Sequence, residues 1–168
     1  MTQETVDRML KDYNHCVARR DHLITAIAEL TAQRAREQSK AMTQEALHGA
    51  VMNGMPHGSN PGNPVESLVL RYASGYQPQY IQQMDADIRM MQDELKELKA
   101  VCSFVSAWLL ALNDKERILV QAHIIDGLSW AETVPMLQQK YPGTFTGSRS
   151  GLRDLQRRAL EKIYGVAQ

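Results

Sequence analysis

The sequence is poor in the residues that build disulfide frameworks and metal sites, since its 168 residues include only two cysteines. Cys16 and Cys102 stand far apart and form no C-x-x-C pair, which argues against a disulfide scaffold and against zinc. Both fall on apolar faces of predicted helices, where a free cysteine packs as a small hydrophobic residue. The histidines are too sparse for a ligand set, so we expect no metal and no cofactor.

Long apolar runs are also missing. A membrane-spanning helix needs roughly 20 apolar residues, and the longest apolar patch, near residues 101–112, is interrupted by Ser103 and Ser106. Residues 1–10 are polar, and the apolar segment of a secretory signal does not follow them. We therefore expect no membrane partner and a cytoplasmic location.

The motifs of common enzyme classes are absent as well. The sequence contains no phosphate-binding loop with its lysine, no dinucleotide-binding glycine pattern after a strand, no H-E-x-x-H and no G-x-S-x-G. We therefore predict that the protein is not an enzyme and assign no catalytic residue.

Glycine and proline do not occur in the first 48 residues, so nothing there interrupts a helix. Apolar residues recur at helical spacing from Val6 to Leu30, which predicts one long amphipathic helix over residues 2–39. Arg20 and Arg34 interrupt its apolar stripe. Residues 41–79 are predicted to be irregular, because glycine, proline and asparagine crowd residues 53–64. Asn63 and Pro64 predict the start of one short helix that ends near Gly75.

The strongest periodic pattern follows this loop. Its apolar residues alternate by three and four over more than four heptads, which is the spacing of a coiled-coil seam: Ile81, Met84, Ile88, Met91, Leu95, Leu98, Cys102, Val105, Leu109 and Leu112. A seam this narrow must pack on another helix, because its burial is worth about 25 cal/mol per Å². The first helix suggests an antiparallel hairpin, and a homodimer through the same seam is the alternative.

Short capped helices replace the seam after Leu112. Asn113 or Asp114 caps a predicted helix to about Asp126, and Gly127 suits a left-handed turn. Ser129 and Glu132 form the capping box of a second helix, predicted over residues 130–140 with Ala131, Val134 and Leu137 facing inward. Thr146 or Ser148 caps a third helix to about Tyr164, and its inner stripe consists of Leu152, Leu155, Ala159 and Ile163.

The third helix is basic although the whole chain is neutral. Residues 149–163 hold five cations against two anions, and Arg149, Arg153 and Arg157 follow one another at i, i+4 on a face away from the leucines. Helix, glycine turn, short helix and basic helix is the order of a helix-turn-helix, whose last helix enters the major groove of DNA. Charge alone also fits a solvated helix face.

Three segments resemble region four of sigma factors: residues 112–117 (LNDKER), residues 126–132 (DGLSWAE), and the pattern of Leu152, Leu155, Ala159, Leu160 and Ile163. They resemble still more closely the phage late-gene transcription regulators of the RinA/ArpU kind, in which long N-terminal helices precede a sigma-like module. The resemblance covers most of the chain in layout and residues 112–163 in detail. It implies binding of double-stranded DNA near a promoter, contact with bacterial RNA polymerase, and action in a bacterial host cell.

By position, the resemblance gives the recognition-helix roles to Ser148, Arg149, Ser150, Arg153 and Arg157. Lys115 and Arg117 are predicted to touch the DNA backbone from the first helix of the module.

The predicted fold is thus all-α: a long antiparallel hairpin over residues 1–111, with its loop at about 41–79, followed by a helix-turn-helix domain over residues 112–168. Two other functions stay open at this point. A small terminase-like packaging subunit also joins a helix-turn-helix to a coiled coil, although it usually carries the DNA-binding module first. A structural coiled-coil adaptor would show no affinity for DNA.

Overall fold

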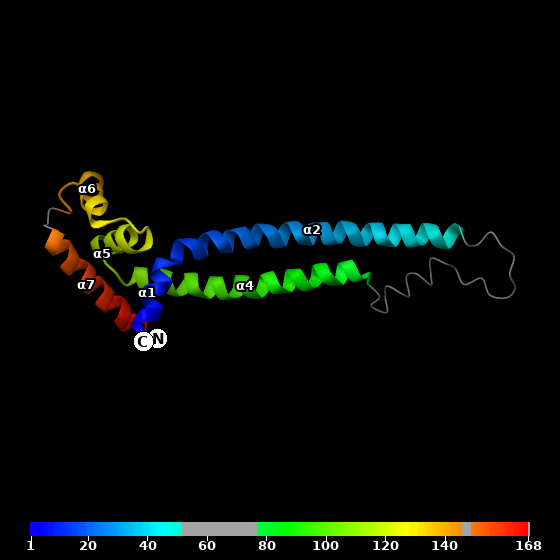
Figure 1. The fold of residues 1–168 in the computed structure, drawn as a ribbon, viewed down its shortest axis with the longest axis horizontal. Coiled ribbons are helices and arrows are strands. Elements are labelled where there is room, and N and C mark those ends of the chain that lie inside the picture. The colour runs from blue at the N-terminus through cyan, green and yellow to red at the C-terminus, as the bar shows by residue number, and fades with distance from the viewer. Residues whose placement is uncertain (52–76, 146–148, 168) are drawn as a thin grey trace. The chain divides into compact units, whose positions relative to one another are not determined.

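A computed structural model gives the fold of residues 1–51, 77–145 and 149–167 (Figure 1). Every regular element in these ranges is a helix, which confirms the predicted all-α class. The helices are α1 (Gln3–Lys11), α2 (Tyr13–Val51), α4 (Gln79–Leu110), α5 (Asp114–Val120), the π-helical η2 (Gln121–Ile125), α6 (Trp130–Lys140) and α7 (Arg149–Val166). Among these described helices, none is long and apolar enough to cross a membrane.

The N-terminal helical segment corrects the prediction of one uninterrupted helix over residues 2–39. Helix α1 ends at Lys11, and α2 begins at Tyr13. The intervening Asp12 keeps helical hydrogen bonds, since its N–H donates to the Arg8 carbonyl (2.9 Å) and its carbonyl accepts from the Cys16 N–H (2.9 Å). The interruption is therefore a local bend in the backbone and not a loop.

Helix α2 also extends further than the sequence indicated. It continues to Val51, so residues 41–51 are helical and the prediction of irregular structure there was wrong. The glycine- and proline-rich stretch begins only at residue 53, and the residues before it are mostly good helix formers. The short helix predicted between Asn63 and Gly75 lies outside the described residues.

The chain divides into two compact units, residues 23–94 and residues 1–22 with 95–168. In residues 23–94, α2 and α4 run antiparallel side by side (Figure 1). Arg34 of α2 donates from Nε and Nη2 to the two carboxylate oxygens of Asp85 in α4, at 2.9 and 3.1 Å. The arginine that interrupts the apolar stripe thus forms a bidentate ion pair between the two helices.

The other unit combines both ends of the chain around one core. Val6 and Leu10 of α1 are buried in it together with Leu112, which connects α4 to α5, and with residues of α4, α5, η2 and α7: Val105, Trp108, Leu109, Val120, Ile125, Ala159 and Ile163. Tyr164 Oη donates to Asp7 Oδ1 at 2.6 Å, which joins α7 to α1. The predicted domain boundary follows residue 111, whereas the two compact units divide the chain after residues 22 and 94. Helix α1 packs with the C-terminal helices and therefore belongs to their unit.

A second, smaller core lies among the C-terminal helices themselves. Its buried members are Leu119, Leu137, Phe145 and Leu152, so it joins α5, α6, α7 and the segment between α6 and α7. Trp130, Val134 and Leu155 pack against it at its edge. The two cores fix α7 along its length, because Leu152 lies in one core and Ile163 in the other.

Candidate nucleic-acid interface

The helix starts that lead to the candidate interface are capped as the sequence predicts. Asn113 Oδ1 accepts from the Glu116 N–H at 2.9 Å, and the Glu116 carboxylate accepts from the Asn113 N–H at 3.1 Å. The Ser129 N–H donates to Glu132 Oε2 at 2.9 Å in the second capping box. Hydrogen bonds from the Ser129 side chain and backbone lower the pKa of Glu132. Both capping boxes satisfy backbone groups that a helix start leaves unpaired.

The sequence predicts one regular helix to about Asp126, but the α-helical part, α5, ends at Val120 and a wider helical turn follows it. This turn is the π-helical η2, in which the Asp126 N–H donates to the Gln121 carbonyl at 2.8 Å. Gly127 then takes a φ of +70°, as its predicted left-handed position requires. Asn14 of α2 donates from Nδ2 to the Ile125 carbonyl (3.3 Å) and to Asp126 Oδ1 (3.0 Å), so an N-terminal residue caps this turn.

Two packing positions on α6 differ from the prediction. Ala131, expected to face inward, is exposed, whereas Thr133 is fully buried. The Thr133 hydroxyl hydrogen-bonds to the carbonyls of Ser129 (2.8 Å) and Leu128 (3.2 Å). A buried hydroxyl needs such partners, and apolar periodicity could not reveal them.

Helix α7 has the two faces that the sequence predicts. Leu152, Ala159 and Ile163 are buried and Leu155 is half-buried, which confirms the inner stripe. On the outer side the arginines and Ser150 are exposed. Residues 149–158 contain four arginines and one aspartate, so the first half of α7 presents a positive surface. We call Arg149, Arg153 and Arg157 the arginine row.

The members of the arginine row differ in their neighbours. Arg157 Nη2 lies 3.5 Å from Asp154 Oδ1, but both side chains are more than 60% exposed, so this pair is weak and easily exchanged for another anion. Arg153 lies over the ring of Trp130, with its guanidinium carbon 5.9 Å from the ring centroid. Gln3 of α1 lines a surface hollow of about 390 Å³ together with Arg153 and Arg157. Ser148, also predicted to belong to the site, lies outside the described residues.

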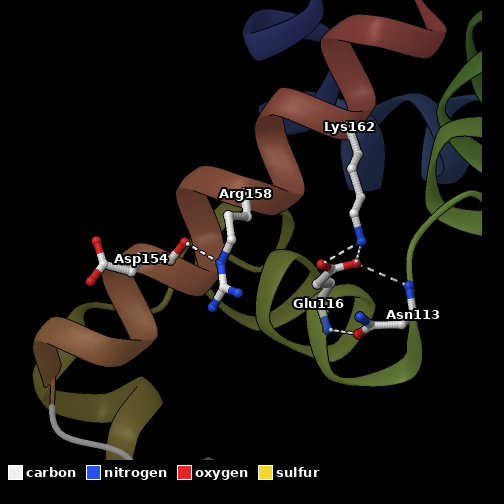
Figure 2. Close-up of polar contacts among 5 residues, drawn as sticks. All are labelled: Asn113, Glu116, Asp154, Arg158 and Lys162. Carbon is white, nitrogen blue, oxygen red and sulfur yellow. Dashed lines mark hydrogen bonds and ion pairs between the residues drawn. The ribbon is translucent and has the colours of Figure 1, made fainter.

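One cation of the basic stripe has a different role. Lys162 Nζ donates to both carboxylate oxygens of Glu116, at 2.7 and 2.8 Å, and so joins α7 to α5 (Figure 2). Glu116 is only 3% exposed. Lys162 therefore counterbalances a buried carboxylate, and the five-cation stripe read from the sequence is smaller on the surface.

The protonation of Glu116 reflects this environment. Burial acts to raise the pKa of its carboxyl group, but the hydrogen bonds from Lys162 and from the Asn113 N–H outweigh burial, and the net pKa is lowered. Arg158 contributes in the same direction through its charge, and its Nε donates to the Asp154 carbonyl at 3.3 Å (Figure 2). A charged Glu116 thus stabilises the attachment of α7 to α5.

The two cations predicted on α5 occupy unlike surroundings. Lys115 is exposed. Arg117 is half-buried, forms an ion pair with Asp114 of its own helix, and lines a hollow that also includes Met136 and Lys140 of α6. The structure therefore leaves Lys115 accessible, whereas the guanidinium of Arg117 already has a carboxylate partner.

The contact between Trp130 and Arg153 is not among the features that the sequence predicts. Trp130 does border a core, but it is only half-buried and touches a member of the arginine row. Sequence spacing gives no warning of this pair, since the two residues belong to different helices. Comparison of the chain with protein families, curated proteins and solved structures found no match.

Proposed function

We propose that this chain is a DNA-binding transcription regulator in which α5, η2, α6 and α7 act as a helix-turn-helix. In this proposal α7 enters the major groove with its first turns, and α2 and α4 form a long hairpin that carries the module. The observation that supports it is the arginine row, three exposed guanidinium groups at i, i+4 on a helix whose opposite side is buried.

The chemistry of the arginine row matches a duplex in two respects. A guanidinium presents a planar fork of donors that fits the O6 and N7 acceptors of guanine. Arginines that do not reach a base edge bind phosphate and supply affinity that is independent of sequence. The start of α7 adds backbone N–H groups and the positive end of the helix dipole, which also favour phosphate.

The resemblance to phage late-gene regulators extends the proposal to its setting. It places the action of the protein at a promoter, with bacterial RNA polymerase as a second partner, inside a bacterial host cell. A homodimer through the long helices would give the two-fold symmetry that operators of helix-turn-helix proteins often mirror.

The first test is binding of the full chain to duplex DNA, followed by fluorescence anisotropy between 50 and 200 mM salt. If three arginines neutralise phosphates, the slope of log K against log salt is about −2.7, and affinity falls about 40-fold across that range. No binding at 50 mM salt would contradict the proposal and favour a structural adaptor.

The second test uses a duplex selected from a random library by the wild-type protein. Arg149→Ala and Arg153→Ala are each expected to weaken binding to it by about 1–3 kcal/mol if they contact bases. Arg89→Ala, which removes an exposed arginine from α4, is the matched control and is expected to leave binding unchanged. Equal affinities of all three variants would remove Arg149 and Arg153 from the interface.

Regulation itself needs a promoter assay. Genomic fragments bound by the protein are placed before a reporter gene in bacteria, and expression is measured with and without the protein. A change in transcription supports a regulator. Binding confined to a packaging site, with no effect on transcription, would support a packaging subunit instead.

A further inference from the structure

One member of the arginine row, Arg153, belongs to a group of three side chains that come from three different elements. The ring of His123 in η2 lies 4.0 Å from the ring of Trp130, centroid to centroid, at an interplanar angle of 40°. The guanidinium of Arg153 in α7 lies over the same indole, at 5.9 Å from its centroid. Trp130 therefore contacts both a histidine that belongs to the turn and an arginine that belongs to the proposed reading helix.

The backbone around this stack is fixed by hydrogen bonds. His123 Nδ1 donates to the Leu128 carbonyl at 2.6 Å, which sets the orientation of the imidazole. Trp130 is the first residue of α6 and lies within the Ser129–Glu132 capping box. The indole also packs at the edge of the core formed by Leu137 and Leu152. The indole thus presents a half-buried face to Arg153, and its neighbours in the turn and in the core limit its movement.

We propose that Trp130 is a stacking platform that pre-orients Arg153 to read a guanine edge. This inference rests on the proposed function and identifies Trp130 as a positioning residue for it. An aromatic face attracts a guanidinium and reduces its rotational freedom. The donors lie at the rim of the guanidinium plane, so a stacked arginine keeps them available to a planar pair of acceptors. Less freedom is then lost when the base is bound.

The arginine row is divided in function as a result. Arg153, with its fixed platform, determines the base at one position of the operator. Arg157, whose neighbour is an exposed and weakly held aspartate, binds phosphate. Loss of Arg153 therefore lowers the ratio between specific and non-specific affinity, whereas loss of Arg157 lowers both affinities together.

The test compares full-length variants on the selected duplex and on an unrelated duplex of equal length. Trp130→Leu removes the aromatic face but keeps an apolar side chain, and Trp130→Phe keeps an aromatic face. We expect Trp130→Leu to lower the ratio of the two affinities roughly threefold to tenfold, with unchanged affinity for the unrelated duplex. Trp130→Phe retains most of the ratio. In an Arg153→Ala background, Trp130→Leu has no further effect on the ratio.

A second measurement keeps the inference testable if Trp130→Leu is poorly folded. In the free wild-type protein, NMR is expected to show the side-chain Nε–H proton of Arg153 shifted by the indole ring current, a shift that Trp130→Phe reduces but retains. An unshifted proton would overturn the platform. The platform would also be overturned if a folded Trp130→Leu variant kept the wild-type affinity ratio while Arg153→Ala lowered that ratio. This result would leave the proposed function intact. Failure of the wild type to bind either duplex at low salt would instead overturn the proposed function, and the platform with it.

Discussion

Removing the cation that faces the buried carboxylate gives the sharpest test of how α7 is attached. In Lys162→Met, Glu116 loses two hydrogen bonds at 2.7 and 2.8 Å and keeps the one from the Asn113 N–H at 3.1 Å. Breaking a fully buried pair costs about 3–5 kcal/mol. The Lys162 side chain is 49% exposed, so water reaches the carboxylate and reduces the loss. We expect the free energy of unfolding to fall by about 1–3 kcal/mol at pH 7.

The pH dependence distinguishes this ion pair from ordinary packing. In the wild type the folded pKa of Glu116 lies below its usual value, so its contribution is present above the unfolded pKa and is lost as the pH falls through the folded pKa. Without Lys162, burial is opposed only by the hydrogen bond from Asn113 and the charge of Arg158, so the charged form of Glu116 contributes less to stability. The difference between the two proteins should therefore be largest near pH 7 and shrink toward pH 3.

The assay is urea unfolding followed by tryptophan fluorescence. Both tryptophans of the chain, Trp108 and Trp130, belong to the unit that contains the ion pair, so the signal reports on that unit. Lys99→Met, which removes an exposed lysine from α4, is the control for a lost surface charge. A Lys162→Met destabilisation that matches the control, or that does not change between pH 3 and 7, would refute the role given to Glu116.

Three further predictions concern the same unit. Leu10→Ala leaves a cavity in place of a fully buried side chain and should lower the free energy of unfolding by about 2–5 kcal/mol in the same urea assay. A loss below about 1 kcal/mol would show that α1 is not held in the core. Gly127→Ala forces an L-residue into a φ of +70° and should lower the free energy of unfolding by about 1–2 kcal/mol. Gly165→Ala is the control, because this glycine also faces open space but has no positive φ, and it should not destabilise the protein. Equal effects of the two substitutions would contradict backbone strain at Gly127. Burial, the hydrogen bond to Asp7 and the negative charge of Asp7 raise the pKa of Tyr164 to about 12. The free energy of unfolding should therefore fall as the pH rises from 10 to 12. A Tyr164→Phe variant that loses stability in the same way would exclude this group as the cause.

The C-terminal helices could be predicted closely because their signals are local. Caps such as Asn113 and Ser129 act within one turn, and Gly127 needs its left-handed backbone whatever its tertiary neighbours are. The spacing of Leu152, Ala159 and Ile163 likewise reports directly which side of α7 is buried.

The features that escaped prediction depend on partners far away in the sequence. The pairing of Lys162 with Glu116, and of Arg153 with Trp130, joins residues of different helices, and a single sequence does not reveal such pairs. The bend at Asp12 has no glycine or proline to announce it. Periodicity predicted that α1 is amphipathic, but it could not show that α1 buries Val6 and Leu10 among the C-terminal helices.

The hydrogen bond between Asp7 and Tyr164 joins residues that are 157 positions apart, which matters while the chain is being synthesised. Contacts between distant residues form late, since a long loop must close before they are made. At a ribosomal rate of about 5–20 residues per second, α7 follows α1 by roughly 8–30 s, and only then is the core around Val6 and Leu10 complete. During translation the apolar side of α1 therefore stays incompletely buried until α7 has been made.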